Sequence, residues 1–381
     1  MKHIYFDNAA TTKIRDEVID AITDVMKNNY GNASSSHSFG RSSKTLVESS
    51  RKQIASFFNV SASEIVFTSG GTESDNLVLR SAVRDLCVTH IITSRVEHHG
   101  VLHTLEQLQT EYNVSVSYVN LDAEGQISME HLEELLQTNQ KTLVSLMHIN
   151  NEIGNILDIK RVAELCKTNN ALFHSDAVQS VGHYKLDLQE IPIDFMAASA
   201  HKFHGPKGVG FAFLRKGSGL KPLIFGGDQE RGYRAGTESV HNIVGLEKSL
   251  TMAYNNLETE SNYVKGIKSY FIEQLKVNIP DVSFNGSSGD MTKSTYTSFN
   301  VCLPVAPEKS AMLLFQLDLK GIACSKGSAC QSGSTQGSHV LAQILSDEAM
   351  QKPSIRFSFS IYNTKDEVDY VVGVLKELVN S

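Results

Sequence analysis

Polar side chains that could do chemistry follow five short β-branched runs of the chain, each at the point where the run ends. The five clusters span residues 69–73, 97–99, 150–152, 176–179 and 199–202. In an open parallel sheet, ligands bind beyond the carboxyl ends of the strands, because the loops converge there and the helix amino termini point inward. If each run is a strand of one such sheet, the five clusters meet in a single site.

Three of these clusters carry groups with a definite chemical use. Lys202, at a partly buried site, would have a lowered pKa and would be nucleophilic toward an aldehyde. An unpaired Asp176 carboxylate would be costly to bury, so it implies a cationic partner such as a protonated pyridine nitrogen. The turn 69–72 lies between a strand and a helix, where free backbone N–H groups and the positive helix end favour a phosphate.

Together with His98, a flat residue that could stack on a ring, these groups describe a site for pyridoxal phosphate. Taken singly, each has an ordinary interpretation, since a lysine is usually a solvated surface charge and a Gly-Gly-Thr turn usually caps a helix. The turn also lacks the glycine spacings of the nucleotide-binding loops. The prediction of a cofactor site therefore depends on these groups meeting at one rim.

The elements that must position these residues alternate between strand and helix. We predict strands at 65–68, 90–94, 114–119, 142–149, 171–175, 194–198 and 208–214, with helical periodicity between them. This alternation predicts an α/β fold whose large domain is a doubly wound, mostly parallel, seven-stranded sheet that binds the cofactor.

The carboxyl-terminal third of the chain has a different pattern. From about residue 240 a helical pattern runs to Pro280, and such a helix could link two domains. The remainder predicts a smaller α+β domain, with strands near 297–303 and 354–359, a helix at about 308–319, and a last helix that begins with the capping box Thr364-x-x-Glu367. We expect residues 15–249 to form the large domain, and residues 1–14 with 250–381 to form the small one.

Composition excludes several classes of protein. Hydrophobic residues make up 41% and charged residues 20%, and the net charge is −7 with no long basic run, which argues against nucleic acid as a partner. No run of 18 apolar residues occurs, so we expect no membrane span. The five cysteines form an odd set without C-x-x-C spacing, which argues against a disulfide framework and a bound metal and favours a cytoplasmic location.

The ordered motifs of the chain resemble those of the cysteine desulfurases, which are fold-type I pyridoxal phosphate enzymes related to the class V aminotransferases. The resemblance spans nearly the whole chain and is carried by residues 5–12, 30–32, 67–74, 148–154, 176–180, 199–202, 231–237, 327–330 and 354–358. It implies the activity of that family, in which L-cysteine is converted to L-alanine while an enzyme persulfide forms.

The resemblance also implies a role for individual residues. Lys202 would bind the cofactor covalently, Asp176 would hold its ring nitrogen protonated, and His98 would stack on the ring. Gln179 and Asn151 would contact the ring oxygen and orient the substrate, whose carboxylate would be received by Arg356 and Asn32. The phosphate would be held by Gly71, Thr72, Ser199, His201 and, across the interface of a homodimer, by Thr237.

By the same resemblance Cys330 would be the catalytic cysteine. It lies in a Gly/Ser-rich stretch at about 324–337 without apolar periodicity, so we expect a loop that can carry a thiolate in and out of the site. Cys324, six residues earlier, is either a small hydrophobe at a strand end or a thiol that pairs with Cys330, and we favour the first.

The predicted function is therefore a pyridoxal phosphate-dependent cysteine desulfurase that passes sulfur from Cys330 to an acceptor protein for iron–sulfur cluster assembly, tRNA thiolation or a thio-cofactor. The sequence does not identify that acceptor. Two alternatives stay open. One is a selenocysteine lyase or another class V aminotransferase-like enzyme, and the other is a non-catalytic sulfur carrier that keeps the fold. Intact Lys202, Asp176 and Arg356 argue against the carrier.

Overall fold

A seven-stranded sheet forms the centre of the larger part of the molecule. The computed structural model describes residues 3–306, 310, 312–326 and 337–380. The sheet has the order β2 (Ile65–Thr68), β8 (Gly210–Leu214), β7 (Phe195–Ser199), β6 (Leu172–Asp176), β5 (Thr142–Ser145), β3 (His90–Thr93) and β4 (Ser115–Tyr118). Strand β8 runs antiparallel to both of its neighbours, and the pairs from β7 to β4 are parallel. The prediction of a mostly parallel seven-stranded sheet is confirmed.

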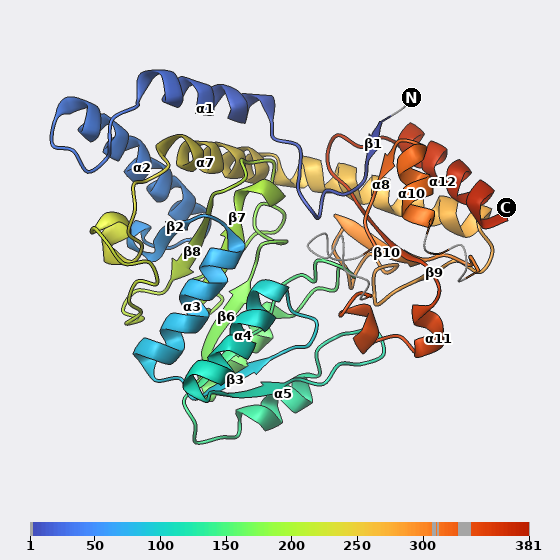
Figure 1. Ribbon diagram of the computed structural model, residues 1–381, viewed down its shortest axis with the longest axis horizontal. Helices are drawn as coiled ribbons and strands as arrows, with labels where there is room; N and C mark the ends of the chain where they lie inside the picture. The colour runs from blue at the N-terminus through green and yellow to red at the C-terminus, as the bar shows by residue number, and fades with distance from the viewer. Residues whose placement is uncertain (1–2, 307–309, 311, 327–336, 381) are drawn as a thin grey trace.

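Helices cover both faces of this sheet (Figure 1). Along β8, Phe211 and Phe213 pack into one apolar cluster, while Ala212 and Leu214 pack into another on the opposite face. The first cluster includes side chains of α2 (Ser38–Phe57), α5 (Met129–Leu136), α6 (Ile159–Thr168) and α7 (Val240–Asn255), and the second those of α3 (Gly71–Leu86) and α4 (His99–Tyr112). Because successive strand residues point to opposite faces, a strand buried on both sides is apolar throughout, as β8 is.

One predicted strand ends earlier than expected. The run 142–149 was predicted as a single strand, but β5 ends at Ser145. Beyond it the chain stays buried, and the backbone N–H of His148 donates to the carbonyl oxygen of Asp176 at 3.0 Å. Apolar composition cannot separate a buried strand from the buried loop that continues it, which explains the error.

The helical pattern after residue 240 corresponds to two helices. They are α7 and α8 (Leu257–Asn278), and the single residue between them, Asn256, donates its N–H back to the carbonyl oxygen of Met252 at 3.1 Å. Figure 1 shows α7 lying over the large sheet beside α1 (Asp16–Asn28) and α8 continuing toward the second part of the molecule. The predicted connection between two parts is therefore present, with a break at one residue.

The second part has a small sheet and two long helices. Strand β10 (Ser298–Cys302) lies between β12 (Ser354–Ser358) and β9 (Ser283–Phe284), antiparallel to both, and α8 packs with α12 (Lys365–Asn380). Strand β1 (Ile4–Tyr5) pairs with β11 (Ile322–Ala323), so Ile4 and Phe6 join the apolar cluster of residues 264–375. The remaining described elements are α10 (Leu313–Leu319), α11 (Asp347–Met350) and the 3-10 turns η1 (Ala62–Glu64), η2 (Ala200–Lys202), η3 (Gln229–Gly232) and η5 (Leu341–Gln343).

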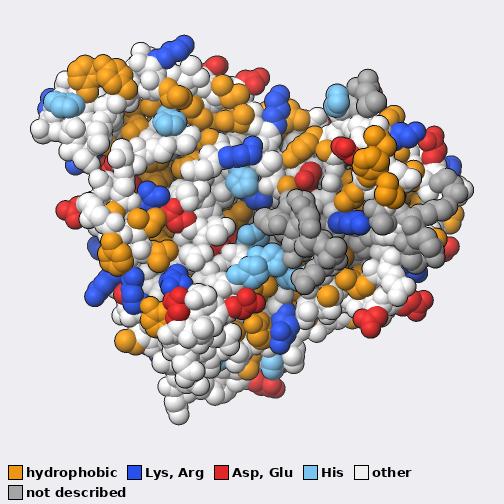
Figure 2. All heavy atoms as spheres, in the orientation of Figure 1, with side chains coloured by type: hydrophobic (Ala, Val, Ile, Leu, Met, Phe, Trp, Pro, Cys, Tyr) orange, Lys and Arg blue, Asp and Glu red, His pale blue; other side chains and the backbone are white. Residues whose placement is uncertain are grey.

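The surface agrees with the near balance of charges in the sequence. On the face shown in Figure 2, acidic and basic side chains are interspersed among apolar and neutral ones. Within the described ranges, no helix is both long and apolar enough to cross a bilayer.

Candidate active site

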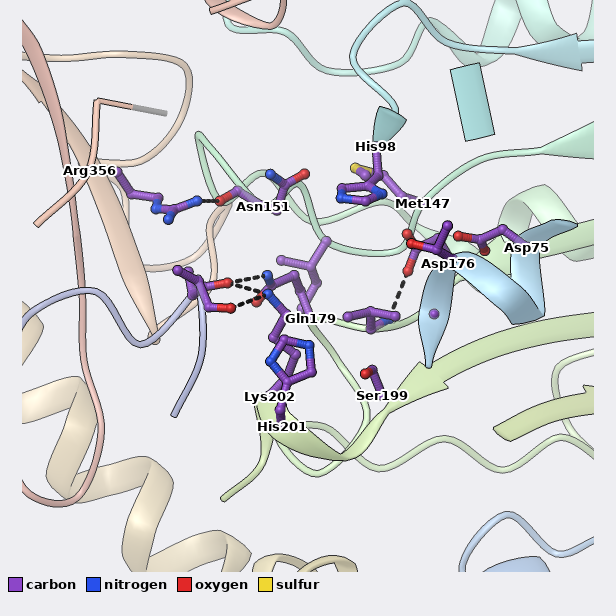
Figure 3. Close-up of a pocket in the computed structure, with 16 residues that line it drawn as sticks. Asp75, His98, Met147, Asn151, Asp176, Gln179, Ser199, His201, Lys202 and Arg356 are labelled. Carbon is purple, nitrogen blue, oxygen red and sulfur yellow. Dashed lines mark hydrogen bonds between the residues drawn. The ribbon is translucent and has the colours of Figure 1, made fainter. Parts of the chain in front are cut away.

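A cavity of about 190 Å³ lies beyond the carboxyl ends of the central strands, where the polar clusters were expected to meet. Figure 3 shows its lining residues converging from both parts of the molecule. The predicted site residues that line it are Gly71, Thr72, His98, Asn151, Asp176, Gln179, Ser199, His201, Lys202 and Arg356.

Lys202 is the last residue of the 3-10 turn η2, which directly follows strand β7. Its Nζ donates to the carbonyl oxygens of Ala9 at 2.6 Å and Ala10 at 2.9 Å, and Gln179 Nε2 donates to the same Ala9 oxygen at 3.0 Å. The amino-terminal segment therefore holds the lysine head in the cavity. Both of these acceptors are neutral backbone carbonyls.

Asp176 ends strand β6 and lies at the floor of the cavity, where it is 7% exposed. Its Oδ1 accepts a hydrogen bond from the N–H of Val178 at 2.9 Å. Burial raises the pKa of the Asp176 carboxyl, while the neighbouring His98 and Lys202 and the Val178 N–H act to lower it. A cationic ring nitrogen placed against this oxygen pair would favour the ionised form in the same way.

The amino terminus of α3 forms a cup on the other side of Asp176. Gly70 has φ of +149°, a conformation that favours glycine, and a Cβ added to Gly71 would lie 2.6 Å from Val178 Cγ2. The cup therefore needs small residues so that a ligand group can approach the backbone N–H groups of the first turn. Thr72 and Ser199 add hydroxyl groups to the same wall of the cavity.

A carboxylate and a guanidinium brace this cup from outside. Glu73 Oε2 accepts the N–H of Ser69 at 2.8 Å, and Glu73 Oε1 accepts Nε of Arg234 at 2.9 Å. Although burial raises the pKa of Glu73, the hydrogen bonds from Arg234 and Ser69 bring it below its usual value. Since Glu73 is fully engaged with these two partners, it fixes the turn that precedes α3.

Arg356 reaches the cavity from strand β12 of the second part, with a side chain that is 1% exposed. Its two terminal nitrogens donate to the carbonyl oxygen of Asn151 at 2.7 Å and to Asp7 Oδ1 at 2.9 Å. Its Nε is buried and makes no hydrogen bond to the residues that the structure describes. Because Arg356 lines the cavity, its guanidinium is placed to bind a carboxylate that enters it.

Three predicted site residues do not line this cavity in the described structure. Asn32 is exposed, and its Oδ1 accepts the N–H of Ser34 at 2.9 Å. Thr237 is also exposed. Cys330 lies outside the described residues.

Sequence reasoning missed several residues that the structure brings into the cavity, namely Ala9, Ala10, Asp75, Met147, Ile149 and Val178. Asp75 lies three residues after Thr72 and so shares a face of the same helix, but this spacing does not show that the face is buried. Ala9 and Ala10 contribute backbone carbonyl oxygens, for which a side-chain pattern gives no signal.

Comparison with known proteins agrees with this geometry. A family profile described as "Aminotransferase class-V" matches residues 4–371. The cysteine desulfurase IscS of Dictyoglomus turgidum is 39% identical over 383 residues, covering 99% of this chain and 95% of that protein. The chain belongs to the cysteine desulfurase family.

Solved structures of the same kind extend the comparison to the fold. A structure described as "NIFS-LIKE PROTEIN" has a TM-score of 0.90 and 33% identity, with complete coverage of both chains. A structure described as "SspA in complex with cysteine" has a TM-score of 0.82 and 30% identity, covering 95% of this chain and all of that one. The fold prediction is thereby confirmed at the level of the whole chain.

The cavity suits the pyridoxal phosphate that the desulfurase family uses. The glycine cup at α3 can take a phosphate, Asp176 a ring nitrogen, and Lys202 an aldehyde, and all three face one space. Burial lowers the pKa of His201 to about 4, with the charges of Lys202 and Lys207 adding to the effect, so this ring is neutral at physiological pH. A neutral imidazole can donate one hydrogen bond to a phosphate without carrying a charge.

Cys324 is the described cysteine nearest in sequence to the predicted nucleophile. Its side chain packs against the apolar cluster of the second part, and burial raises the pKa of its thiol to about 12. A thiol with that pKa is almost entirely protonated at neutral pH and therefore a poor nucleophile. These observations favour the interpretation of Cys324 as a small hydrophobe.

Proposed function

We propose that this protein is a pyridoxal phosphate-dependent cysteine desulfurase that converts L-cysteine to L-alanine and retains the sulfur as a persulfide on Cys330. One observation carries the proposal. Three residues from different strands or strand ends line one cavity, namely Lys202, Asp176 and Arg356. The choice of substrate is supported by SspA, a relative with the same fold whose solved structure is a complex with cysteine.

Each group has a task that follows from its position. When bound, pyridoxal phosphate supplies an aldehyde for attachment and a ring that withdraws electrons from the substrate Cα. Lys202 would bind the cofactor and then hold and return the proton of Cα. Asp176 would keep the ring nitrogen protonated, and His98 would cover the ring face.

The carboxylate of the substrate would be held by Arg356, which lines the cavity. In sulfur transfer, the Cys330 thiolate would attack the substrate sulfur, so that an S–S bond forms while the substrate C–S bond breaks. The electron pair of that bond passes to the carbon skeleton, which takes up protons to become alanine, and the enzyme thiol becomes a persulfide.

We also propose that the enzyme is a homodimer and that Thr237 contacts the phosphate in the neighbouring subunit. Large apolar side chains on the outside support an interface, with Tyr30 73%, Phe39 52% and Phe225 76% exposed.

We propose that residues 15–249 form one domain and that residues 1–14 with 250–381 form the other. The sulfur would pass to an acceptor protein in the cytoplasm, a reducing compartment that keeps the thiol free.

The deciding experiment is to incubate the purified chain with pyridoxal phosphate and L-cysteine, and to measure alanine and protein-bound persulfide together. We expect equal amounts of both in the first turnover. The Cys330→Ala variant should keep the bound-cofactor absorbance and form no persulfide, while Lys202→Ala should not attach the cofactor covalently. Alanine formation without a persulfide, or persulfide that persists in Cys330→Ala, would contradict the assignment.

A further inference from the structure

A second carboxyl group lies beside Asp176 and makes no hydrogen bond within the described residues. Asp75, in helix α3, is 0% exposed and lines the cavity. Neither of its oxygens makes a hydrogen bond with the described residues. One oxygen of Asp75, one oxygen of Asp176 and one ring nitrogen of His98 all lie within 4.8 Å of one another. Buried polar groups without partners are rare enough to need an explanation.

Among the described residues, those whose charges shift the pKa of Asp75 are both acidic. His174, on β6, has its Nε2 3.4 Å from Asp75 Oδ1, but its Nδ1 is engaged with Ser145 Oγ at 2.9 Å, and burial lowers the pKa of His174 to about 3. His98 Nδ1 accepts the N–H of Gly100 at 3.0 Å and therefore carries no proton at that nitrogen. The two charged groups that raise the pKa of Asp75 are carboxylates.

Those acidic neighbours are Asp176 on β6 and Glu97 in the connection between β3 and α4. Burial raises the pKa of Asp75 well above its usual value, and the charges of Asp176 and Glu97 raise it further. Burial raises the pKa of Glu97 as well. Two adjacent buried carboxylates cannot both ionise without strong repulsion, so a proton is retained by one of them.

The structure indicates which member of the pair keeps that proton. Asp176 accepts the Val178 N–H and lies near Lys202, and both interactions favour its anion. Asp75 has neither kind of support. These observations favour Asp75 as the carboxyl that keeps the proton.

We propose that Asp75 is a positioning residue that stays protonated at neutral pH, so that Asp176 carries the negative charge at the cavity floor. This inference rests on the proposed function in one respect, which is the cofactor ring nitrogen as the partner of Asp176. In that setting a neutral Asp75 keeps the floor at a single negative charge, which matches a single protonated ring nitrogen.

Infrared difference spectroscopy of the full chain tests this protonation directly, both as purified and after pyridoxal phosphate is supplied. We expect the carbonyl band of a protonated carboxylic acid in the wild-type protein at neutral pH, and its loss in Asp75→Asn. Glu97→Gln is the matched control, because it removes a neighbouring buried acid and should leave the Asp75 band in place. A spectrum in which Asp75→Asn removes no such band would overturn the proposal.

The pH dependence of protein stability provides a second test of whether Asp75 is protonated. A carboxyl whose pKa is raised in the folded state destabilises the fold as pH rises above the unfolded value of 3.8. Relative to Asp75→Asn, the unfolding constant of the wild-type protein should rise about tenfold per pH unit from there toward the folded pKa. A pH-independent difference between the two proteins would contradict the inference.

A bound cation is the competing explanation, because it would keep Asp75 ionised. Infrared spectra recorded before and after treatment with EDTA distinguish the two. If the acid band is present before the chelator is added, the proton is supported; if it appears only afterwards, the proposal is wrong. These measurements do not depend on turnover. An ionised Asp75 would therefore not contradict the desulfurase proposal, and the protonation of Asp75 could still be measured in an inactive enzyme.

Discussion

The sharpest prediction concerns Gly71, the first residue of helix α3. A Cβ at this position would lie 2.6 Å from Val178 Cγ2, so a methyl group cannot be added unless one of the two segments moves. The Val178 N–H donates to Asp176 Oδ1, and a shift of this residue would therefore disturb the carboxylate as well as the phosphate cup. Overpacking of this kind costs about 1–3 kcal/mol. If this strain raises the free energy of the cofactor-bound protein and not that of the cofactor-free protein, Gly71→Ala should bind pyridoxal phosphate about 5- to 150-fold more weakly.

The assay is an absorbance titration of the cofactor-free chain with pyridoxal phosphate, with thermal unfolding measured in parallel. Gly71→Ala combined with Val178→Ala should recover most of the lost affinity, because the second change removes the methyl group that clashes. Gly266→Ala in helix α8 is the control, since a Cβ there meets nothing within 4 Å. It should leave the affinity unchanged and stabilise the helix by up to about 1 kcal/mol. Wild-type affinity in Gly71→Ala, or failure of the double variant to recover, would refute the steric argument.

Three further predictions follow from buried charges. Arg51→Met should destabilise the fold by about 3–5 kcal/mol in denaturant unfolding, because Glu230, paired with Arg51 at 2.6 Å, stays buried without its partner. The control Arg80→Met removes one side of a partly exposed pair and should cost at most about 1 kcal/mol, so equal losses in the two variants would contradict the prediction. Burial lowers the pKa of Lys268 to about 7. Between about pH 7 and 10.5 the unfolded chain binds more protons than the folded protein, so the unfolding free energy of the wild type relative to Lys268→Met should rise with pH. A pH-independent difference in unfolding free energy would be inconsistent with a neutral Lys268. Arg356→Lys should raise KM for cysteine roughly tenfold or more, since a charged hydrogen bond is worth about 1.5–3 kcal/mol, and an unchanged KM would exclude Arg356 from carboxylate binding.

The part of the site that local pattern predicts correctly is the part built from strand ends. Lys202 and Asp176 follow the adjacent strands β7 and β6, so their meeting is a consequence of sheet order and needs no knowledge of side-chain packing. The phosphate cup follows for the same reason, because α3 begins directly beyond β2. Alternation of strand and helix was enough to place these groups on one rim.

Other parts of the site had no local signal. Arg356 lies in an antiparallel strand of the second part, and it reaches the cavity because β12 lies beside the segment that contains Asp7. Its role was predicted from family resemblance alone. Asp75 was hidden in the amphipathic pattern of α3, where a polar residue is ordinarily assigned to the solvent side. In the folded protein, α4 and β6 bury that face of α3, so Asp75 lies away from solvent. This burial depends on tertiary packing and cannot be predicted from the helix sequence alone.

The contact between the two ends of the chain has a thermodynamic consequence. The segment after β1 runs from the β1–β11 strand pair into the cavity. There Asp7 accepts a hydrogen bond from Arg356, and the carbonyls of Ala9 and Ala10 accept from Lys202. Ala9 and Ala10 line this cavity, so a cofactor that contacts their wall would bind the docked segment in preference to the undocked one. Binding to the docked state alone stabilises it by about 2.7 kcal/mol when the free ligand is at 100 times its Kd. Hydrogen exchange of residues 4–12 should accordingly slow about 100-fold under that condition, and equal exchange with and without pyridoxal phosphate would show that the segment docks independently of the cofactor.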